Sequence, residues 1–357
     1  CVTFPAHTTL ATGQLPGKHG ITADTIRTAP GTFVTEPTDP SLMLVEPIWT
    51  TATRQGIKTL VHDWPLSQQQ PAENPAAYYR DTYDGASDDS TRLNFALEQW
   101  RASATAAADD DTQKLRLVMV RLNDILSAGL LNGPRTEETY EAVAATDSAL
   151  KTFFDTVQAE WETLAPANAN LVVLISTDHG LAELKKNVNL PDLLGEELMA
   201  NAEVVAHNGV ANLWFKDLPE SEIDRNLLIE KFDDVVSKFI YFRTYKKEDL
   251  PADWEYNHSD RVGDRVMTLK TDYGFTDMSA EEPVFDPTEG PGYFGGYGYP
   301  VNESIRMSGQ IILAGYPNPV ARGDFGEIGQ TEFHATVCKL LGIEPAAGAN
   351  PTTLELR

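Results

Sequence analysis

The chain has 357 residues, of which 41% are hydrophobic, which suffices for one large or two ordinary globular domains. It carries 53 acidic and 28 basic residues, and its formal net charge of −25 argues against a nucleic-acid-binding face. No apolar run is long enough for a membrane helix. Two cysteines, Cys1 and Cys338, exclude a disulfide framework and leave a single bridge between them open.

The opening stretch predicts a short helix followed by a loop. Residues 8–12 are small, Gly13 permits a sharp turn, and Pro16-Gly17 favours a loop. Thr3 is thereby expected just before the start of the helix, where free N–H groups favour an anion. Its hydroxyl either caps the helix or is placed to hold or attack a phosphoryl group.

The next part of the chain predicts alternating strands and helices. The last predicted strand, 171–177, is an apolar run typical of a central parallel strand covered on both faces. Together with the strand and helix before it, this run predicts a βαβ unit with a right-handed crossover. Residues 67–90 are expected to form a surface excursion. The helices are predicted over 48–56, 89–103 and 136–160, and the strands over 58–64, 115–122 and 171–177.

The remainder of the chain is less regular. Residues 190–285 are predicted as an inserted sub-region of a single domain that spans 1–357. After it, residues 307–315 are expected to rejoin the main sheet, and residues 332–341 to form a final helix closed by Gly342. Within the sub-region we expect strands at 204–205, 211–215 and 266–269 and a helix over 219–238.

The opening motif resembles the signature of the type I phosphodiesterases/nucleotide pyrophosphatases, a family of the alkaline phosphatase superfamily. The matching residues are Thr3-Phe-Pro-Ala-His-Thr-Thr-Leu-Ala-Thr-Gly13, His19-Gly20-Ile21 and Asp178-His179-Gly180. The resemblance implies a three-layer α/β/α domain with a mostly parallel central sheet, whose first strand would precede Cys1. It also implies that Thr3 is a nucleophile beside two zinc ions, with Asp178 and His179 as metal ligands.

Several positions depart from the ligand set that the resemblance implies. The family pattern Asp-x-x-Gly-His-x-x-Gly-Pro aligns on Gly129 and Gly133-Pro134, which places Leu126 and Leu130 where an aspartate and a histidine are expected. A hydrocarbon side chain has no lone pair for a metal. The neighbouring Asp124 is interpreted as a solvated turn residue, and the family's first aspartate ligand would lie upstream of Cys1.

Two further replacements affect the same region. Tyr297 stands where the family carries its last histidine ligand, and a phenol is a poor zinc ligand. Asp24 replaces an asparagine that steadies a phosphoryl oxygen, so an amide donor becomes a carboxylate. One of the two metal sites is therefore predicted to be lost. The segment 290–300 is expected to be a lid, a recognition loop rich in tyrosine, or a plain surface loop.

Three functions follow from the resemblance and its departures. We favour a pseudoenzyme that serves as a structural or binding module. The alternatives are an active zinc-dependent phosphodiesterase with Thr3 as nucleophile, and a one-metal esterase that recruits Asp24. The cofactor is one zinc or other divalent ion, or none, and the partner is a protein or a phosphoester ligand. We expect an extracellular, secretory or periplasmic location, which the acidic charge suits, and the start of the chain inside a motif leaves a preceding signal or anchor open.

Overall fold

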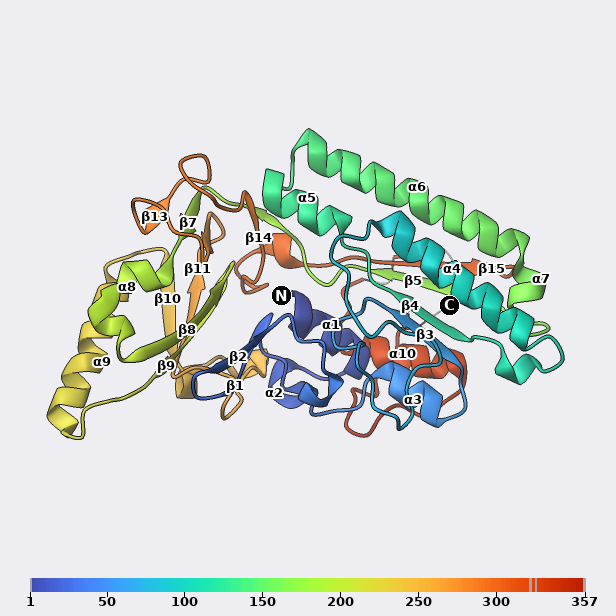
Figure 1. Cartoon of the computed structure of the whole chain (residues 1–357), viewed down its shortest axis with the longest axis horizontal. Helices are drawn as coiled ribbons and strands as arrows, with labels where there is room; N and C mark the ends of the chain where they lie inside the picture. Colours follow the sequence, from blue (N-terminus) through green and yellow to red (C-terminus); the bar gives the residue numbers. More distant parts are fainter. Residues whose placement is uncertain (1, 321–322, 325, 356–357) are drawn as a thin grey trace.

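The computed structural model describes residues 2–320, 323–324 and 326–355. Figure 1 shows an elongated molecule with an α/β part at one end and a second sheet with two helices at the other, and α1 begins where they meet. Cys1 lies outside the described residues, so a bridge to Cys338 stays untested, and Cys338 itself is buried. Among the described residues, no helix is long and apolar enough to cross a membrane.

The first helix, α1 (Thr3–Thr12), is buried along its whole length. It ends at Gly13, which adopts the left-handed conformation with φ 68° and donates its N–H to Thr9. The helix begins one residue earlier than expected. Val2, which has no side-chain oxygen, occupies the N-cap position. The interpretation of Thr3 as a capping residue is therefore wrong, and its hydroxyl is free for another contact.

The α/β part has two short sheets. Strand β3 (Thr59–His62) pairs in parallel with β4 (Leu117–Val120), whereas β5 (Leu171–Ser176) pairs antiparallel with β15 (Ile311–Tyr316). The expected βαβ unit does not form, because β4 and β5 belong to different ladders among the described residues. The apolar run of β5 indicated a covered strand, yet Ile175 remains 36% exposed. Apolar composition does not specify the direction of the neighbouring strand.

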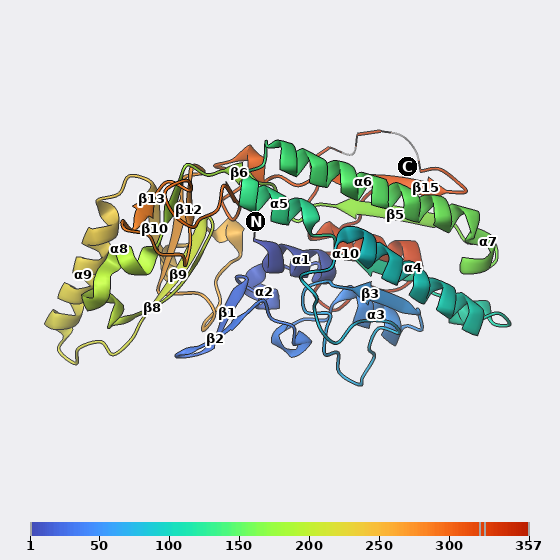
Figure 2. The same cartoon turned by 45° about the horizontal axis from the view of Figure 1, so that its top comes forward.

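Helices cover both faces of the β3–β4 pair. Leu60 points to a core that it shares with α4 (Asp89–Ala106) and α6 (Glu137–Ala159). The next residue, Val61, points to the opposite core with α1, α3 (Ile48–Arg54) and α10 (Glu332–Leu341). Successive side chains of a strand face opposite sides, so this alternation gives the three layers of an α/β/α fold. Figure 1 shows α6 above these strands and α3 below them, and in Figure 2 α6 and α4 lie above β3.

The predicted sub-region is more regular than its sequence indicated. Four antiparallel strands form a sheet in the order β10-β11-β9-β8, and two helices cover it. Its core includes Leu213, Met267 and Phe232, and extends to Tyr297 and Val2 beside α1. The elements are α8 (Leu190–Met199), β8 (Ala202–His207), β9 (Val210–Phe215), α9 (Glu222–Ser237), β10 (Phe242–Lys246) and β11 (Arg265–Leu269).

Short elements connect these parts, and most predicted helices and strands are confirmed within a few residues. Helix α10 is closed by Gly342 as expected. The remaining elements are α2 (Pro16–His19), β1 (Thr25–Ala29), β2 (Thr32–Thr35), α5 (Asp124–Asn132), α7 (Trp161–Leu164), β6 (Ala182–Glu183), β7 (Lys186–Val188), β12 (Tyr273–Phe275), β13 (Val284–Phe285) and β14 (Gly295–Gly296).

Candidate functional site

Thr3 and His179 meet at the N-terminus of α1, although 176 residues separate them in the chain. The Thr3 Oγ1 lies 3.0 Å from the His179 Nε2, and both residues are buried. The other ring nitrogen, Nδ1, donates to the carbonyl oxygen of Gly180 at 2.8 Å. Because a carbonyl only accepts, the neutral imidazole carries its lone pair on Nε2, directed at Thr3.

Asp178 completes this group. Its Oδ2 lies 3.2 Å from the Nε2 of His179 and 3.3 Å from the Nδ1 of His7, and hydrogen-bonds to neither. The His7 Nδ1–H instead donates to the Thr3 carbonyl at 2.9 Å. Burial opposes the Asp178 charge, but the nearby imidazoles of His179 and His7 outweigh it and hold the pKa below its ordinary value. Burial lowers the pKa of His179 despite the facing carboxylate.

These three side chains fit one divalent cation. The Nε2 of His179 and the Oδ2 of Asp178 lie 3.2 Å apart, the carboxylate oxygen lacks a hydrogen bond, and both are atoms that a divalent cation could contact together. The Thr3 hydroxyl faces the same point. Among the described residues, however, no three histidine, cysteine, aspartate or glutamate side chains gather as a metal-binding group, so an ion here would need further ligands.

The residues at the other expected metal position do not fit an ion. Leu126 and Leu130 on α5 are half-buried and pack against the core that contains Tyr297. The Leu130 carbonyl accepts from Phe294 at 2.9 Å, which brings α5 against the segment that carries Tyr297. Gly295 permits this approach, since a Cβ there would collide with the Gly129 carbonyl. The side chains at these two aligned positions are therefore hydrocarbon that packs against this core.

Tyr297 and Asp24 form a pair beside Thr3. The Tyr297 ring stacks on His179 with ring centroids 4.3 Å apart, and its hydroxyl donates to Asp24 Oδ2 at 2.8 Å. The Asp24 Oδ1 accepts from the Phe4 backbone N–H, also at 2.8 Å. Burial, followed by the Asp24 charge, raises the pKa of Tyr297 well above its ordinary value, so the phenol stays protonated. Both carboxylate oxygens of Asp24 are engaged, which opposes its recruitment as a metal ligand.

The segment 290–300 differs from all three expectations for it. Tyr297 and Tyr299 are buried, and the Tyr299 hydroxyl donates to the Tyr273 carbonyl at 2.7 Å. The tyrosines are thus internal contacts rather than a lid or an exposed recognition surface. His207 was not singled out in the sequence analysis. Its ring packs edge-on against Tyr297 at 5.9 Å, and no spacing in the sequence signals this contact.

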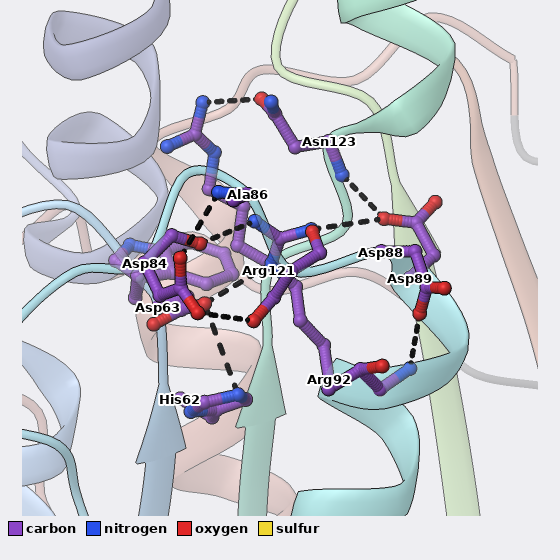
Figure 3. A network of polar contacts seen from close by, with 12 residues as sticks. His62, Asp63, Asp84, Ala86, Asp88, Asp89, Arg92, Arg121 and Asn123 are labelled. Carbon is purple, nitrogen blue, oxygen red and sulfur yellow. Dashed lines mark hydrogen bonds and ion pairs between the residues drawn. The ribbon is translucent and has the colours of Figure 1, made fainter.

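A second polar cluster lies at the carboxyl ends of β3 and β4 (Figure 3). Its centre is Arg92, which is 1% exposed, donates to Asp63 at 3.0 Å and lies 3.6 Å from Asp89. Asp89 accepts from the backbone N–H of Asn123 at 2.7 Å. Asp124 is not a solvated turn residue: it begins α5, and its carboxylate accepts from the Asp89 N–H at 2.9 Å. This cluster joins α4 to α5 and so positions Leu126 and Leu130.

We expect the buried imidazole of His62 to lower the free energy of unfolding in acid. It is fully buried, neither ring nitrogen is hydrogen-bonded, and burial lowers its pKa to about 4 from an ordinary value of 6.5. The unfolded chain therefore takes up a proton first as the pH falls. The contribution of His62 is fully present above pH 6.5 and declines toward pH 4, by up to about 3 kcal/mol. Urea unfolding at pH 7 and pH 4.5 measures this loss as a difference in the free energy of unfolding. His62→Leu should make that difference smaller, and an unchanged difference would contradict the assignment to His62.

Comparison with known proteins supports a single family. The family model described as type I phosphodiesterase/nucleotide pyrophosphatase matches residues 1–297. A pyrophosphatase/phosphodiesterase of Schizosaccharomyces pombe, described as uncharacterized, is 25% identical over 300 residues, or 80% of this chain and 57% of its own length. Mouse ectonucleotide pyrophosphatase/phosphodiesterase family member 1 is 24% identical over 96% of this chain and 36% of its own length. The chain thus spans about a third to over half of these relatives.

Solved structures share the fold. Murine ectonucleotide pyrophosphatase/phosphodiesterase 5 superimposes with a TM-score of 0.74 at 22% identity, covering 96% of this chain and 84% of that one. A further murine structure is described as an inactive threonine-to-alanine variant in complex with AMP, with the same TM-score. The α/β architecture and the family match agree. This chain belongs to the type I phosphodiesterase/nucleotide pyrophosphatase family of the alkaline phosphatase superfamily.

Proposed function

We propose that this chain is a family member that has lost two-metal phosphoester hydrolysis and serves as a structural or binding module. The observation that supports the proposal is that Leu126, Leu130 and Tyr297 stand where the family resemblance expects metal ligands, with the leucines packed against a core and the Tyr297 hydroxyl bonded to Asp24. Two metal ions clamp the attacking and leaving oxygens of a phosphoryl transfer and neutralise its charge. Leucines offer neither lone pairs nor charge, and the Tyr297 hydroxyl is committed to Asp24.

The other half of the site supports binding of at most one divalent ion. Thr3, Asp178 and His179 would hold it, and such an ion would lower the pKa of a coordinated hydroxyl and polarise a bound oxygen. His7 holds the Thr3 carbonyl, and Gly180 fixes the orientation of the His179 ring. These contacts keep Thr3 in place without supplying the charge that the missing site would provide.

The second candidate is a working zinc-dependent phosphodiesterase that uses Thr3. The 3.0 Å contact between Thr3 and His179 favours it, because it preserves a nucleophile beside a ligand. The murine relative described as inactive carries a threonine-to-alanine substitution and is in complex with AMP, which makes Thr3 the residue to test. The one-metal esterase that recruits Asp24 is the least supported, since both of its oxygens are engaged.

Zinc analysis of the purified chain, combined with hydrolysis of bis(p-nitrophenyl) phosphate, separates these functions. The proposal expects at most one zinc per chain, lost in Asp178→Ala, and hydrolysis no faster than that of the Thr3→Ala variant. Thr9→Ala is a matched control, because Thr9 is buried in the same helix and contacts His19 rather than His179. Two zinc ions per chain and turnover that is abolished by Thr3→Ala but not by Thr9→Ala would establish the active enzyme instead.

The names of the relatives also support a location. The mouse family members 1 and 7 are ectonucleotide enzymes by name, and we propose an extracellular or secretory location for this chain on that basis. A net charge of −25 would repel nucleic acids and favours a protein partner or a small ligand.

A further inference from the structure

The N-terminus of α1 is an anion-binding position that the chain fills with its own carboxylate. The first amides of a helix lack intrahelical partners and form the positive end of the helix dipole. In α1 the N-cap residue Val2 supplies no side-chain acceptor, and Pro5 has no N–H. The N–H groups of Thr3 and Phe4 remain, and Asp24 Oδ1 accepts from that of Phe4 at 2.8 Å. Asp24 therefore occupies the place that an external anion would take. The amide that it contacts belongs to the residue that follows Thr3.

The carboxylate is also fixed from the opposite side. The Tyr297 hydroxyl donates to Asp24 Oδ2 at 2.8 Å, and the tyrosine ring is 4% exposed and stacked on His179. Both oxygens thus accept charge-strengthened hydrogen bonds from donors on separate elements. Asp24 cannot turn away without leaving the Phe4 amide and a buried phenol unpaired, so its negative charge stays within the site.

We propose that Asp24 is the specificity-determining residue of the Thr3 site: it excludes phosphoryl groups and restricts the site to cations and uncharged polar ligands. This inference rests on the proposed loss of hydrolysis and names the ligand class of the same site. A phosphate oxygen would have to displace Asp24 from the Phe4 amide or lie against its charge. Like charges in a shared site repel strongly when little solvent screens them.

The test is binding of inorganic phosphate to the purified chain by isothermal titration calorimetry, with and without zinc. Asp24→Asn keeps an oxygen for the Phe4 amide and removes the charge, and it should bind phosphate at least about tenfold more tightly than the unmodified chain. Asp253→Asn makes the same charge change at an exposed position and should leave phosphate affinity unaltered. Tyr297→Phe removes the hydroxyl and retains the carboxylate, so it should not gain phosphate binding.

Thermal unfolding accompanies each titration, and Asp24→Ser, which also removes the charge, replaces Asp24→Asn if that variant does not fold. The inference is overturned if the unmodified chain binds phosphate as tightly as a folded Asp24 variant. It is also overturned if a folded Asp24 variant gains no affinity, in which case Asp24 only caps α1. Failure of the proposed function has a different signature, namely hydrolysis of the diester by the unmodified chain.

Discussion

Replacing Arg92 with methionine should lower the free energy of unfolding by about 3–5 kcal/mol, because it leaves buried carboxylates without a compensating charge. Arg92 is 1% exposed, and its partners Asp63 and Asp89 are 1% and 2% exposed. The guanidinium also donates to the carbonyls of Ser87 and Asp84. Methionine fills much of the same volume, so the loss measures the charge and the donors rather than a cavity. Urea denaturation at pH 7 gives the value.

Arg101 on the same helix provides the control. It is 46% exposed on its side chain and pairs with Glu160, whose side chain is 36% exposed. Arg101→Met removes an equal charge from α4 and should cost less than about 1 kcal/mol, since exposed ion pairs contribute little. Equal losses in the two variants would contradict a special role for the buried cluster. Arg92→Lys should fall between them, because it keeps the charge but loses the planar fork that reaches several acceptors.

The sequence predicts the local elements of the fold well and their long-range partners poorly. Helix α10 and the opening helix end at Gly342 and Gly13 as expected, because glycine in the left-handed conformation is a local signal. The pairing of β5 was wrong, since an apolar run reports burial without naming a neighbour. In α6, Tyr140 and Val143 stand at helical spacing from the buried Phe153 and Val157, yet they are 61% and 43% exposed. Helical spacing alone does not show how wide the buried face is.

In the candidate site, too, local motifs identify individual positions, whereas the contacts between distant residues were not predicted. Gly129 and Gly133 set the register that predicts Leu126 and Leu130 at ligand positions, and that register stays a prediction. The Asp24–Tyr297 pair joins residues 273 positions apart, and no local pattern announces it. Asp124 was misread for the same reason, since its partners Asp89 and Arg92 come from α4, a separate helix. Contacts between distant segments arise from packing, which a single sequence does not record.

Restoring the missing ligands should convert the apolar half of the site into a zinc site whose occupancy stabilises the fold. The variant combines Leu126→Asp, Leu130→His and Tyr297→His. Without metal it should unfold more easily than the unmodified chain, because it places polar groups in a core of hydrocarbon and leaves Asp24 Oδ2 without its tyrosine donor. With zinc, the new carboxylate at position 126 gains a cation as its partner. Because zinc binds only the native state, its binding raises the free energy of unfolding.

Unfolding measured across a zinc titration gives the size of this effect. At a zinc concentration 100-fold above the dissociation constant, the linked gain is about 2.7 kcal/mol, well beyond the error of a denaturation curve. Leu131→His with Tyr140→His is the matched control, because it adds two histidines at positions on α5 and α6 that are 60% and 61% exposed and lie outside the core. If zinc stabilises both variants equally, or neither, then Leu126, Leu130 and Tyr297 do not line a common position, and the argument that one metal site has been lost fails with them.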